Sequence, residues 1–145
     1  MDAQAIAQAS AAALWAEDRA SQGLGIVCAS VGPGTAELHM PIAASMVNGH
    51  GLCHGGFIFT LADSAFAFAC NSHNQRCVAQ SCAITYLAPA KLGETLVARA
   101  REVSRVGRTG IYDITITRQA DSAVIAEFRG QSRTIAGELI ASVSP

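Results

Sequence analysis

Asn48-Gly-His-Gly-Leu-Cys-His-Gly-Gly56 leads into the apolar run Phe57-Ile-Phe-Thr-Leu-Ala-Asp-Ser-Ala-Phe-Ala-Phe-Ala-Cys70, whose one charge is Asp63. Apolar residues fall on nearly every side of a helix from Gly55 to about Asn71, which predicts a helix buried all round. The two glycines at its start leave backbone N–H groups open to a developing negative charge. A carboxylate inside such a helix carries a large desolvation cost unless it is paired or poised for chemistry, so Asp63 is predicted to be half of an active site.

The rest of the chain predicts one further helix and six strands. Residues 3–22 are rich in alanine and are followed by Gly23 and Gly25, which favours a helix packed on the outside. Apolar alternation and turn signals place strands at 26–31, 35–40, 78–87, 95–106, 110–117 and 123–134, with a loop over 41–53.

Alternation along two of these strands predicts one buried sheet face and one wetted face. Leu96, Ala98 and Ala100 alternate with arginines, and Val124, Ala126 and Phe128 alternate with charged residues. Short connections favour antiparallel pairing. The predicted fold class is therefore α+β: a curved antiparallel sheet wrapped around one central helix, with an extra N-terminal helix.

Composition bounds the size, compartment and partners of the protein. A chain of 145 residues is expected to form one domain over 1–145, and 50% apolar against 14% charged residues predicts a homo-oligomer. A net charge of −1 without a basic run argues against nucleic acid. With neither a membrane-length apolar run nor a basic leader, we expect a soluble cytoplasmic protein that does not bind membranes. Five scattered cysteines suit free thiols in a reducing compartment.

The spacing of Gly55 and Asp63 predicts a site shared between subunits. Eight residues of helix span about 12 Å, so one helix cannot bring both groups to one atom. Two central helices lying antiparallel across a two-fold axis would place the amide end of one beside Asp63 of the other. The Gly55 N–H would then stabilise an oxyanion while the carboxylate attacks a carbonyl or activates water, which suits acyl transfer to water.

Plainer interpretations stay open for most of these residues. Asp63 would otherwise be a helix-surface residue, and the glycines would simply allow close packing. Asn48 either caps its own loop or binds the carboxylate or a water. His54 either orients the glycine turn through a hydrogen bond or packs in the loop. Ser81, in the strand after the helix, either reaches the site or satisfies the sheet interior.

A metal site is not predicted. His50, Cys53 and His54 crowd three possible ligands into five residues, and no second cluster follows elsewhere in the chain. Cys53 beside His54 is better read as a small buried hydrophobic residue than as a nucleophile, because adjacent residues seldom face each other.

Several motifs taken together resemble the hotdog-fold acyl-CoA thioesterases, most closely the phenylacetic acid degradation branch. They run from about residue 24 to 135 and are Asn48-Gly-His, Cys53-His-Gly-Gly, Leu61-Ala-Asp63, Ala67-Phe-Ala-Cys-Asn-Ser72, Ile84-Thr-Tyr-Leu, Gly110-Ile-Tyr-Asp113 and Phe128-Arg-Gly130. The resemblance implies a tetramer of two hotdog dimers that hydrolyses aryl-acyl or related CoA thioesters with neither metal nor cofactor.

The resemblance also implies roles for individual residues. The acidic catalyst falls on Asp63, the carbonyl-polarising amide on Gly55, and the family's histidine and asparagine on His54 and Asn48. Where some relatives carry a serine or threonine near the carboxylate, this chain has Ala79, with Ser81 two residues away.

Substrate contacts are expected on both the CoA and the acyl side. Arg108, in a predicted turn, is expected either to contact the CoA phosphates or to be an ordinary exposed turn arginine. Phe66 is expected beside an acyl group lying along the central helix. The alternatives are a hotdog acyl-CoA hydratase or dehydratase, and a non-catalytic acyl-CoA binding protein.

Overall fold

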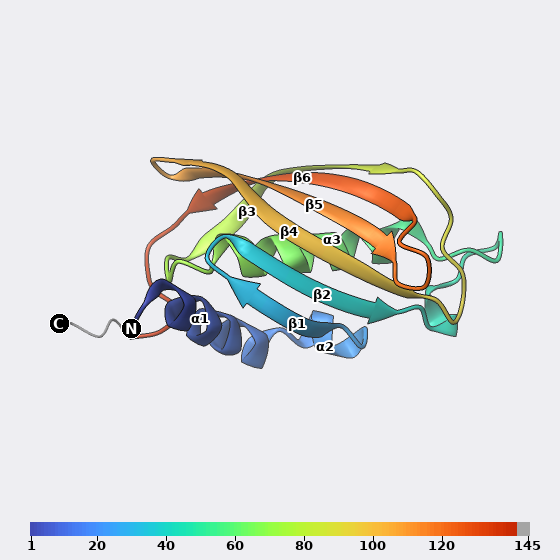
Figure 1. The fold of residues 1–145 in the computed structure, drawn as a ribbon, viewed down its shortest axis with the longest axis horizontal. Helices are drawn as coiled ribbons and strands as arrows, with labels where there is room; N and C mark the ends of the chain where they lie inside the picture. Colours follow the sequence, from blue (N-terminus) through green and yellow to red (C-terminus); the bar gives the residue numbers. More distant parts are fainter. Residues whose placement is uncertain (142–145) are drawn as a thin grey trace.

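The computed structural model describes residues 1–141 and contains one six-stranded antiparallel sheet with the strand order β1-β2-β4-β5-β6-β3. A long helix and a short one precede the sheet, and a second long helix lies between β2 and β3 in the sequence (Figure 1). The elements are α1 (Ala3–Glu17), α2 (Arg19–Gly23), β1 (Val27–Gly32), β2 (Thr35–Pro41), a 3-10 turn (Ala44–Met46), α3 (Gly55–Cys70), β3 (Cys77–Tyr86), β4 (Thr95–Val106), β5 (Thr109–Arg118) and β6 (Val124–Thr134).

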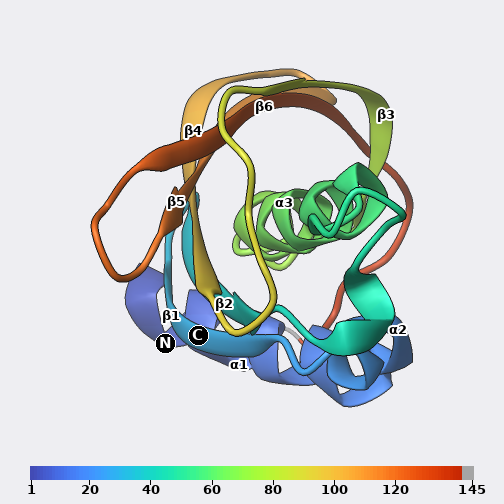
Figure 2. The same ribbon diagram turned by 90° about the vertical axis from the view of Figure 1, so that its right-hand side faces the viewer.

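The sheet curls around α3, as Figure 2 shows in a view along that helix, with α1 and α2 outside near β1. Inward side chains of the helix and of the strands form one core, in which Leu61, Phe66, Leu96, Ile114 and Phe128 are all at most 2% exposed. This is the predicted curved sheet around a central helix, the architecture of a hotdog fold. Within residues 1–141, no helix combines the length and the hydropathy that crossing a membrane requires.

The central helix is not buried all round, which corrects one expectation from the sequence. Gly56, Thr60, Asp63 and Ala67 are partly or fully exposed, and they recur every three or four residues along one stripe. The apolar composition of α3 hid this stripe, because Ala67 and Gly56 are not polar. Asp63 therefore lies on the open side of an otherwise buried helix.

The N-terminal helix is interrupted at Asp18, where a continuous helix over 3–22 was expected. Asp18 leaves the helical conformation at φ −87°, ψ 77°, and its carboxylate accepts from the Ser21 N–H at 3.0 Å and from the Ser21 hydroxyl at 2.6 Å. This is an N-cap, so the aspartate ends α1 and starts α2. Ser21 also bonds Ser64 of α3 at 2.7 Å between hydroxyl oxygens, which fixes α2 against the central helix.

The prediction of which β6 residues face the core was wrong at the first residue of the strand. Val124 is 40% exposed, whereas Ile125 is fully buried. The β5–β6 register shifts between Ile116 and Thr117, opposite this point, and such a bulge reverses which neighbours face the core. From Ala126 onward the predicted alternation holds.

Gly130 of β6 marks a close approach between the sheet and the helix. A Cβ atom there would lie 2.6 to 2.8 Å from the Phe66 ring, which is itself packed against Tyr112 and Phe128. Gly130→Ala should therefore overpack the core and lower the free energy of unfolding by about 1–3 kcal/mol. Urea denaturation measures this, with Gly23→Ala as control because nothing lies within 4 Å of its added Cβ. Equal midpoints for both variants would contradict the prediction.

Candidate active site

His54 caps the start of α3 and shapes its glycine turn. The Gly56 N–H donates to His54 Nδ1 at 3.0 Å, and the His54 N–H donates to the Met46 carbonyl at 2.7 Å. The predicted orienting hydrogen bond of His54 is thus confirmed. Because Nδ1 accepts, this bond assigns the ring proton of the neutral imidazole to Nε2.

Gly55 presents an open N–H at the same turn. It is the first residue of α3, and among the described residues its N–H has no hydrogen-bond acceptor. Its carbonyl accepts from the Tyr86 hydroxyl at 2.8 Å, so β3 holds the turn from the other side. A Cβ on Gly55 would lie 2.9 Å from the Tyr86 ring, which explains a glycine here.

Tyr86 is a site residue that the sequence did not reveal. It stands at the end of β3, 31 residues from Gly55, and only the β3–α3 packing brings its hydroxyl to the turn. Tyr86 belongs to the family motif Ile84-Thr-Tyr-Leu, but that motif did not indicate a role for its hydroxyl at the helix start.

A groove of about 410 Å³ opens beside the Gly55 amide. Its walls are mostly apolar and come from the loop before α3, from α3 and from the end of β3 and the segment after it; they are Asn48, Leu52, Cys53, Gly55, Ile58, Tyr86, Leu87, Ala88, Pro89 and Ala90. Two predicted site residues, Asn48 and Gly55, therefore line one groove.

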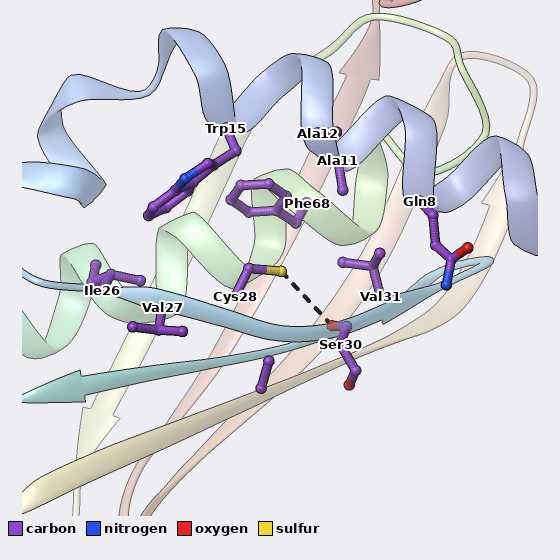
Figure 3. Close-up of a pocket in the computed structure, with 11 residues that line it drawn as sticks. Gln8, Ala11, Ala12, Trp15, Ile26, Val27, Cys28, Ser30, Val31 and Phe68 are labelled. Carbon is purple, nitrogen blue, oxygen red and sulfur yellow. Dashed lines mark hydrogen bonds between the residues drawn. The ribbon is translucent and has the colours of Figure 1, made fainter.

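A second groove of similar size, about 430 Å³, lies between α1 and β1. In Figure 3, Trp15 and Ala11 of α1 stand across from Cys28 and Val31 of β1, with Phe68 of α3 between them. It contains none of the predicted site residues. The Gly55 groove is the better candidate active site, because it holds an open amide at a helix N-terminus.

Asn48 makes the loop-capping bonds that were one of its two predicted roles. Its Oδ1 accepts from the His50 N–H at 2.9 Å and from the Leu52 N–H at 3.2 Å. This Asx turn shapes the loop that forms one wall of the groove. The side-chain Nδ2 has no acceptor among residues 1–141, so it is open to a substrate or a partner group.

Asp63 is half-buried and has neither a hydrogen bond nor an ion pair among the described residues. Burial, and then the negative charge of Asp18, raise the pKa of the Asp63 carboxyl. Burial, and then the charge of Asp63, likewise raise the pKa of the Cys82 thiol. Cys82 packs against the core and so lies on the face of β3 that is turned toward α3. An unpaired carboxylate with a raised pKa at a partly open position is suited to act as a base or nucleophile.

The single chain does not bring Asp63 to the Gly55 groove. The two residues belong to one helix and lie eight positions apart, a rise of about 12 Å. Two features on this side are open: the exposed stripe of α3, and strand β3, which ends the sheet and pairs only with β6. An edge strand without a second neighbour is the usual place for pairing with another chain.

The three predicted substrate contacts lie in different places. Ser81 is exposed and adjoins Cys82, so alternation turns it away from Asp63. Phe66 is 1% exposed and packs in the core against Tyr112 and Phe128, not along the groove. Arg108 is exposed in the β4–β5 turn. Neighbouring residues of that turn, such as Gly107, share a small cavity with Cys70 at the C-terminal end of α3, so the turn lies far from Gly55 of the same chain. Among the described residues, no three His, Cys, Asp or Glu side chains are placed to hold a metal ion.

Comparison with known proteins decides the family. Residues 50–125, which include Gly55 and Asp63, match the model of the thioesterase superfamily. The chain belongs to the thioesterase superfamily. It is 43% identical over 127 residues to the acyl-coenzyme A thioesterase PaaI of Escherichia coli K12, covering 88% of this chain and 90% of that protein. The hotdog thioesterase resemblance and the enzyme class are thereby confirmed.

Solved thioesterase structures agree with this assignment. The E. coli PaaI protein from the phenylacetic acid degradation operon superposes with a TM-score of 0.92 at 41% identity, over 94% of this chain and 99% of that one. A Streptococcus mutans protein solved with bound acetyl-CoA superposes with a TM-score of 0.74 at 26% identity, over 78% and 90% of the two chains. The hotdog fold is therefore confirmed as well.

Proposed function

We propose that this thioesterase hydrolyses acyl-CoA thioesters to free acid and CoA, with aryl-acyl substrates of the phenylacetyl or hydroxyphenylacetyl type, in the degradation of aromatic compounds. The open Gly55 amide at the head of a mostly apolar groove is the observation that carries the proposal. The names of the E. coli relative and its operon support the substrate class. The acetyl-CoA found in the S. mutans structure supports a CoA thioester as ligand.

The working unit that we propose is a two-fold dimer, paired into a tetramer. Edge strand β3 and the open stripe of α3 lie on one side of the chain, and both would be covered by a second copy. Antiparallel α3 helices would then set the Gly55 turn of one subunit beside Asp63 of the other. Each dimer would hold two identical sites.

In this site each group has one task. The Gly55 N–H and the α3 dipole stabilise the negative charge that develops on the thioester oxygen. Asp63 of the other subunit attacks the carbonyl carbon directly or takes a proton from an attacking water. Breaking the carbon–sulfur bond releases the CoA thiol. Asn48 Nδ2 and His54 Nε2–H remain as donors that orient the carbonyl or the carboxylate.

The CoA phosphates are assigned to the β4–β5 turn. Arg108 is exposed and has no acidic partner among residues 1–141. Its carbonyl accepts from the Thr134 N–H at 2.8 Å, which holds the turn against the end of β6. A guanidinium group suits phosphate oxygens. The two-fold arrangement would bring this end of one chain to the Gly55 groove of its partner.

Release of free CoA thiol from a panel of aryl-acetyl, benzoyl and straight-chain acyl-CoA thioesters tests the proposal. We expect hydrolysis of the aryl-acyl members to have the highest kcat/KM. Thiol release from straight-chain substrates alone would contradict the aryl-acyl assignment. An altered acyl chain without thiol release would indicate a hydratase or dehydratase, and ligand binding without any reaction would indicate a binding protein.

Asp18→Asn should shift the acidic limb of the pH–rate profile to lower pH. The Asp18 charge helps to raise the pKa of Asp63, and the reaction needs Asp63 ionised, so activity falls as pH drops through that pKa. Asparagine keeps the α2 cap but removes the charge. Burial remains the larger cause of the raised pKa of Asp63. The activity of the variant should therefore still fall at a pH above the pKa of an ordinary aspartate. If the acidic limb of the kcat/KM profile did not move, the Asp18 charge would not act on the pKa of Asp63.

A further inference from the structure

Two thiols lie together at the end of α3 opposite Gly55. Cys70 is the last residue of this helix, and Cys77 is the first residue of β3. Asn71 connects them: the Cys77 N–H donates to Asn71 Oδ1 at 2.9 Å, while Asn71 Nδ2 contacts Cys70 Sγ at 3.6 Å and the Cys77 carbonyl at 3.2 Å. Both side chains line the same small cavity, and Asn71 contacts both residues, so the short loop keeps the two cysteines close together.

The surroundings of the pair make the two thiols unequal. Cys70 is 3% exposed, whereas Cys77 is partly exposed and also contacts the Thr134 hydroxyl at 3.6 Å. The neighbouring Cys70 thiol, the Thr134 hydroxyl and the positive charge of Arg105 lower the pKa of Cys77 to about 6, against burial, which raises it. The Cys70 thiol itself donates to the Ala67 carbonyl at 3.6 Å. The thiolate is the reactive form of cysteine, so Cys77 is the member of the pair that attacks.

The cavity beside the pair has a volume of about 10 Å³, about the space of one water, and Arg105 and Tyr112 also line it. A hydroperoxide is larger than a water molecule, so it reaches Cys77 from the partly exposed side of that residue. The pair is separate from the groove at Gly55, and Cys70 follows Asp63 by seven residues, about 10 Å along the helix.

We propose that Cys70 and Cys77 are a thiol oxidation site, at which a hydroperoxide converts the two thiols into an intrachain disulfide. The Cys77 thiolate attacks the nearer peroxide oxygen and breaks the O–O bond, giving a sulfenic acid and an alkoxide or hydroxide that takes a proton from water. The Cys70 sulfur then attacks the sulfenic sulfur. The S–S bond forms, and the hydroxyl group leaves as water with the Cys70 proton. Reduction by a dithiol reverses the reaction.

The other three cysteines serve as internal controls. Burial raises the pKa of Cys28 and Cys53, and burial with the charge of Asp63 raises that of Cys82. Among the described residues, none of the three contacts a second thiol. Disulfide formation needs a reactive thiolate and a second thiol beside it, so these three cysteines should stay reduced.

The experiment treats the reduced full-length protein with a small excess of hydrogen peroxide and then alkylates it with N-ethylmaleimide. We expect two of the five thiols to be lost and the peptides containing Cys70 and Cys77 to be joined, lighter by two hydrogen atoms. Cys28, Cys53 and Cys82 should carry the label. Disulfides between chains, or first oxidation at one of those three cysteines, would overturn the proposal. Thiol counting needs no substrate, so the outcome is independent of the proposed thioesterase chemistry.

Single variants separate the roles of the two sulfur atoms. Cys77→Ser should leave all four remaining thiols reduced, whereas Cys70→Ser should leave a sulfenic acid on Cys77 that dimedone traps. Cys28→Ser is the matched control and should still lose two thiols. Unchanged loss of two thiols in Cys77→Ser would overturn the proposal. Circular dichroism confirms that each variant is folded, and the wild-type peptide map stands even if one is not.

Discussion

Replacing Asp63 with asparagine should lower kcat by about a thousandfold, the scale of losing a positioned general base or nucleophile. Asn has the same shape and no basic carboxylate, so substrate binding should change far less than turnover. Steady-state release of CoA thiol at saturating substrate measures the loss. Asp2→Asn is the matched control, because asparagine caps α1 as well as the aspartate does and residue 2 is far along the chain from the groove.

The same substitution should make the protein more stable at neutral pH. Burial raises the pKa of Asp63 in the folded chain, while the unfolded chain keeps the ordinary value. The unfolded state therefore ionises first, and wild-type stability falls as pH rises through these two pKa values. Asparagine never ionises, so the melting temperature of the variant should exceed that of wild type at pH 7, with the difference narrowing in acid. In the proposed dimer, the amides of the partner subunit offset part of the wild-type cost.

Loss of activity together with gain of stability is what a functional carboxylate predicts and a structural one does not. An aspartate that held the fold together would lower both when replaced. An Asp63→Asn enzyme within tenfold of wild-type kcat would exclude the carboxylate from the chemistry. A variant that melts well below wild type would show instead that Asp63 has a structural partner in the assembly.

Local patterning predicted most of the fold because each strand carried its own signal. Strand β4 runs over 95–106 as predicted, since Leu96, Ala98 and Ala100 all face the core, although Val97 between them is buried as well. The prediction failed at two places where strand alternation or helix propensity was overridden by another feature of the chain. Ile125 faces the core because it is the extra residue of a bulge in β6, opposite Ile116 and Thr117 of β5, and Asp18 breaks a helix that alanine content would have continued.

The sequence predicted the reactive groups of the candidate site but not the residues that hold them in place. Gly55 and Asp63 could be found because an open helix start and a charge in an apolar helix are both unusual in sequence. Tyr86 could not, because its hydroxyl reaches Gly55 only through tertiary packing. Cys70 and Cys77 looked like two scattered cysteines, since no spacing motif marks them and only the structure shows that Asn71 contacts both ends of the short loop between them.

Mixing two inactive variants should restore hydrolysis if the site is shared between subunits. Asp63→Ala removes the carboxylate, and Gly55→Pro removes the amide N–H from the other half of the site. Proline is tolerated at the first position of a helix. Its ring must displace only the far end of the exposed Tyr86 side chain. Gly55→Ala is the matched control, because it adds the same Cβ and keeps the N–H; it should retain much more activity than Gly55→Pro.

In a mixed dimer both lesions fall in one site, which leaves the other site with a native Asp63 from one chain and a native Gly55 from its partner. Random assembly of equal amounts makes half of the dimers mixed, so activity should recover to about a quarter of wild type from two nearly inactive parents. Co-expression with two different affinity tags and tandem purification isolates the assemblies that contain both chains. Their activity should be about half of wild type for separate dimers and about 0.3 of wild type for randomly paired tetramers. If each chain used its own Gly55 and Asp63, every site would carry a lesion and the mixture would stay inactive. The measurement thus separates a shared site from a site within one chain, and a folded but inactive mixture would reject the two-fold arrangement on which the proposed mechanism depends.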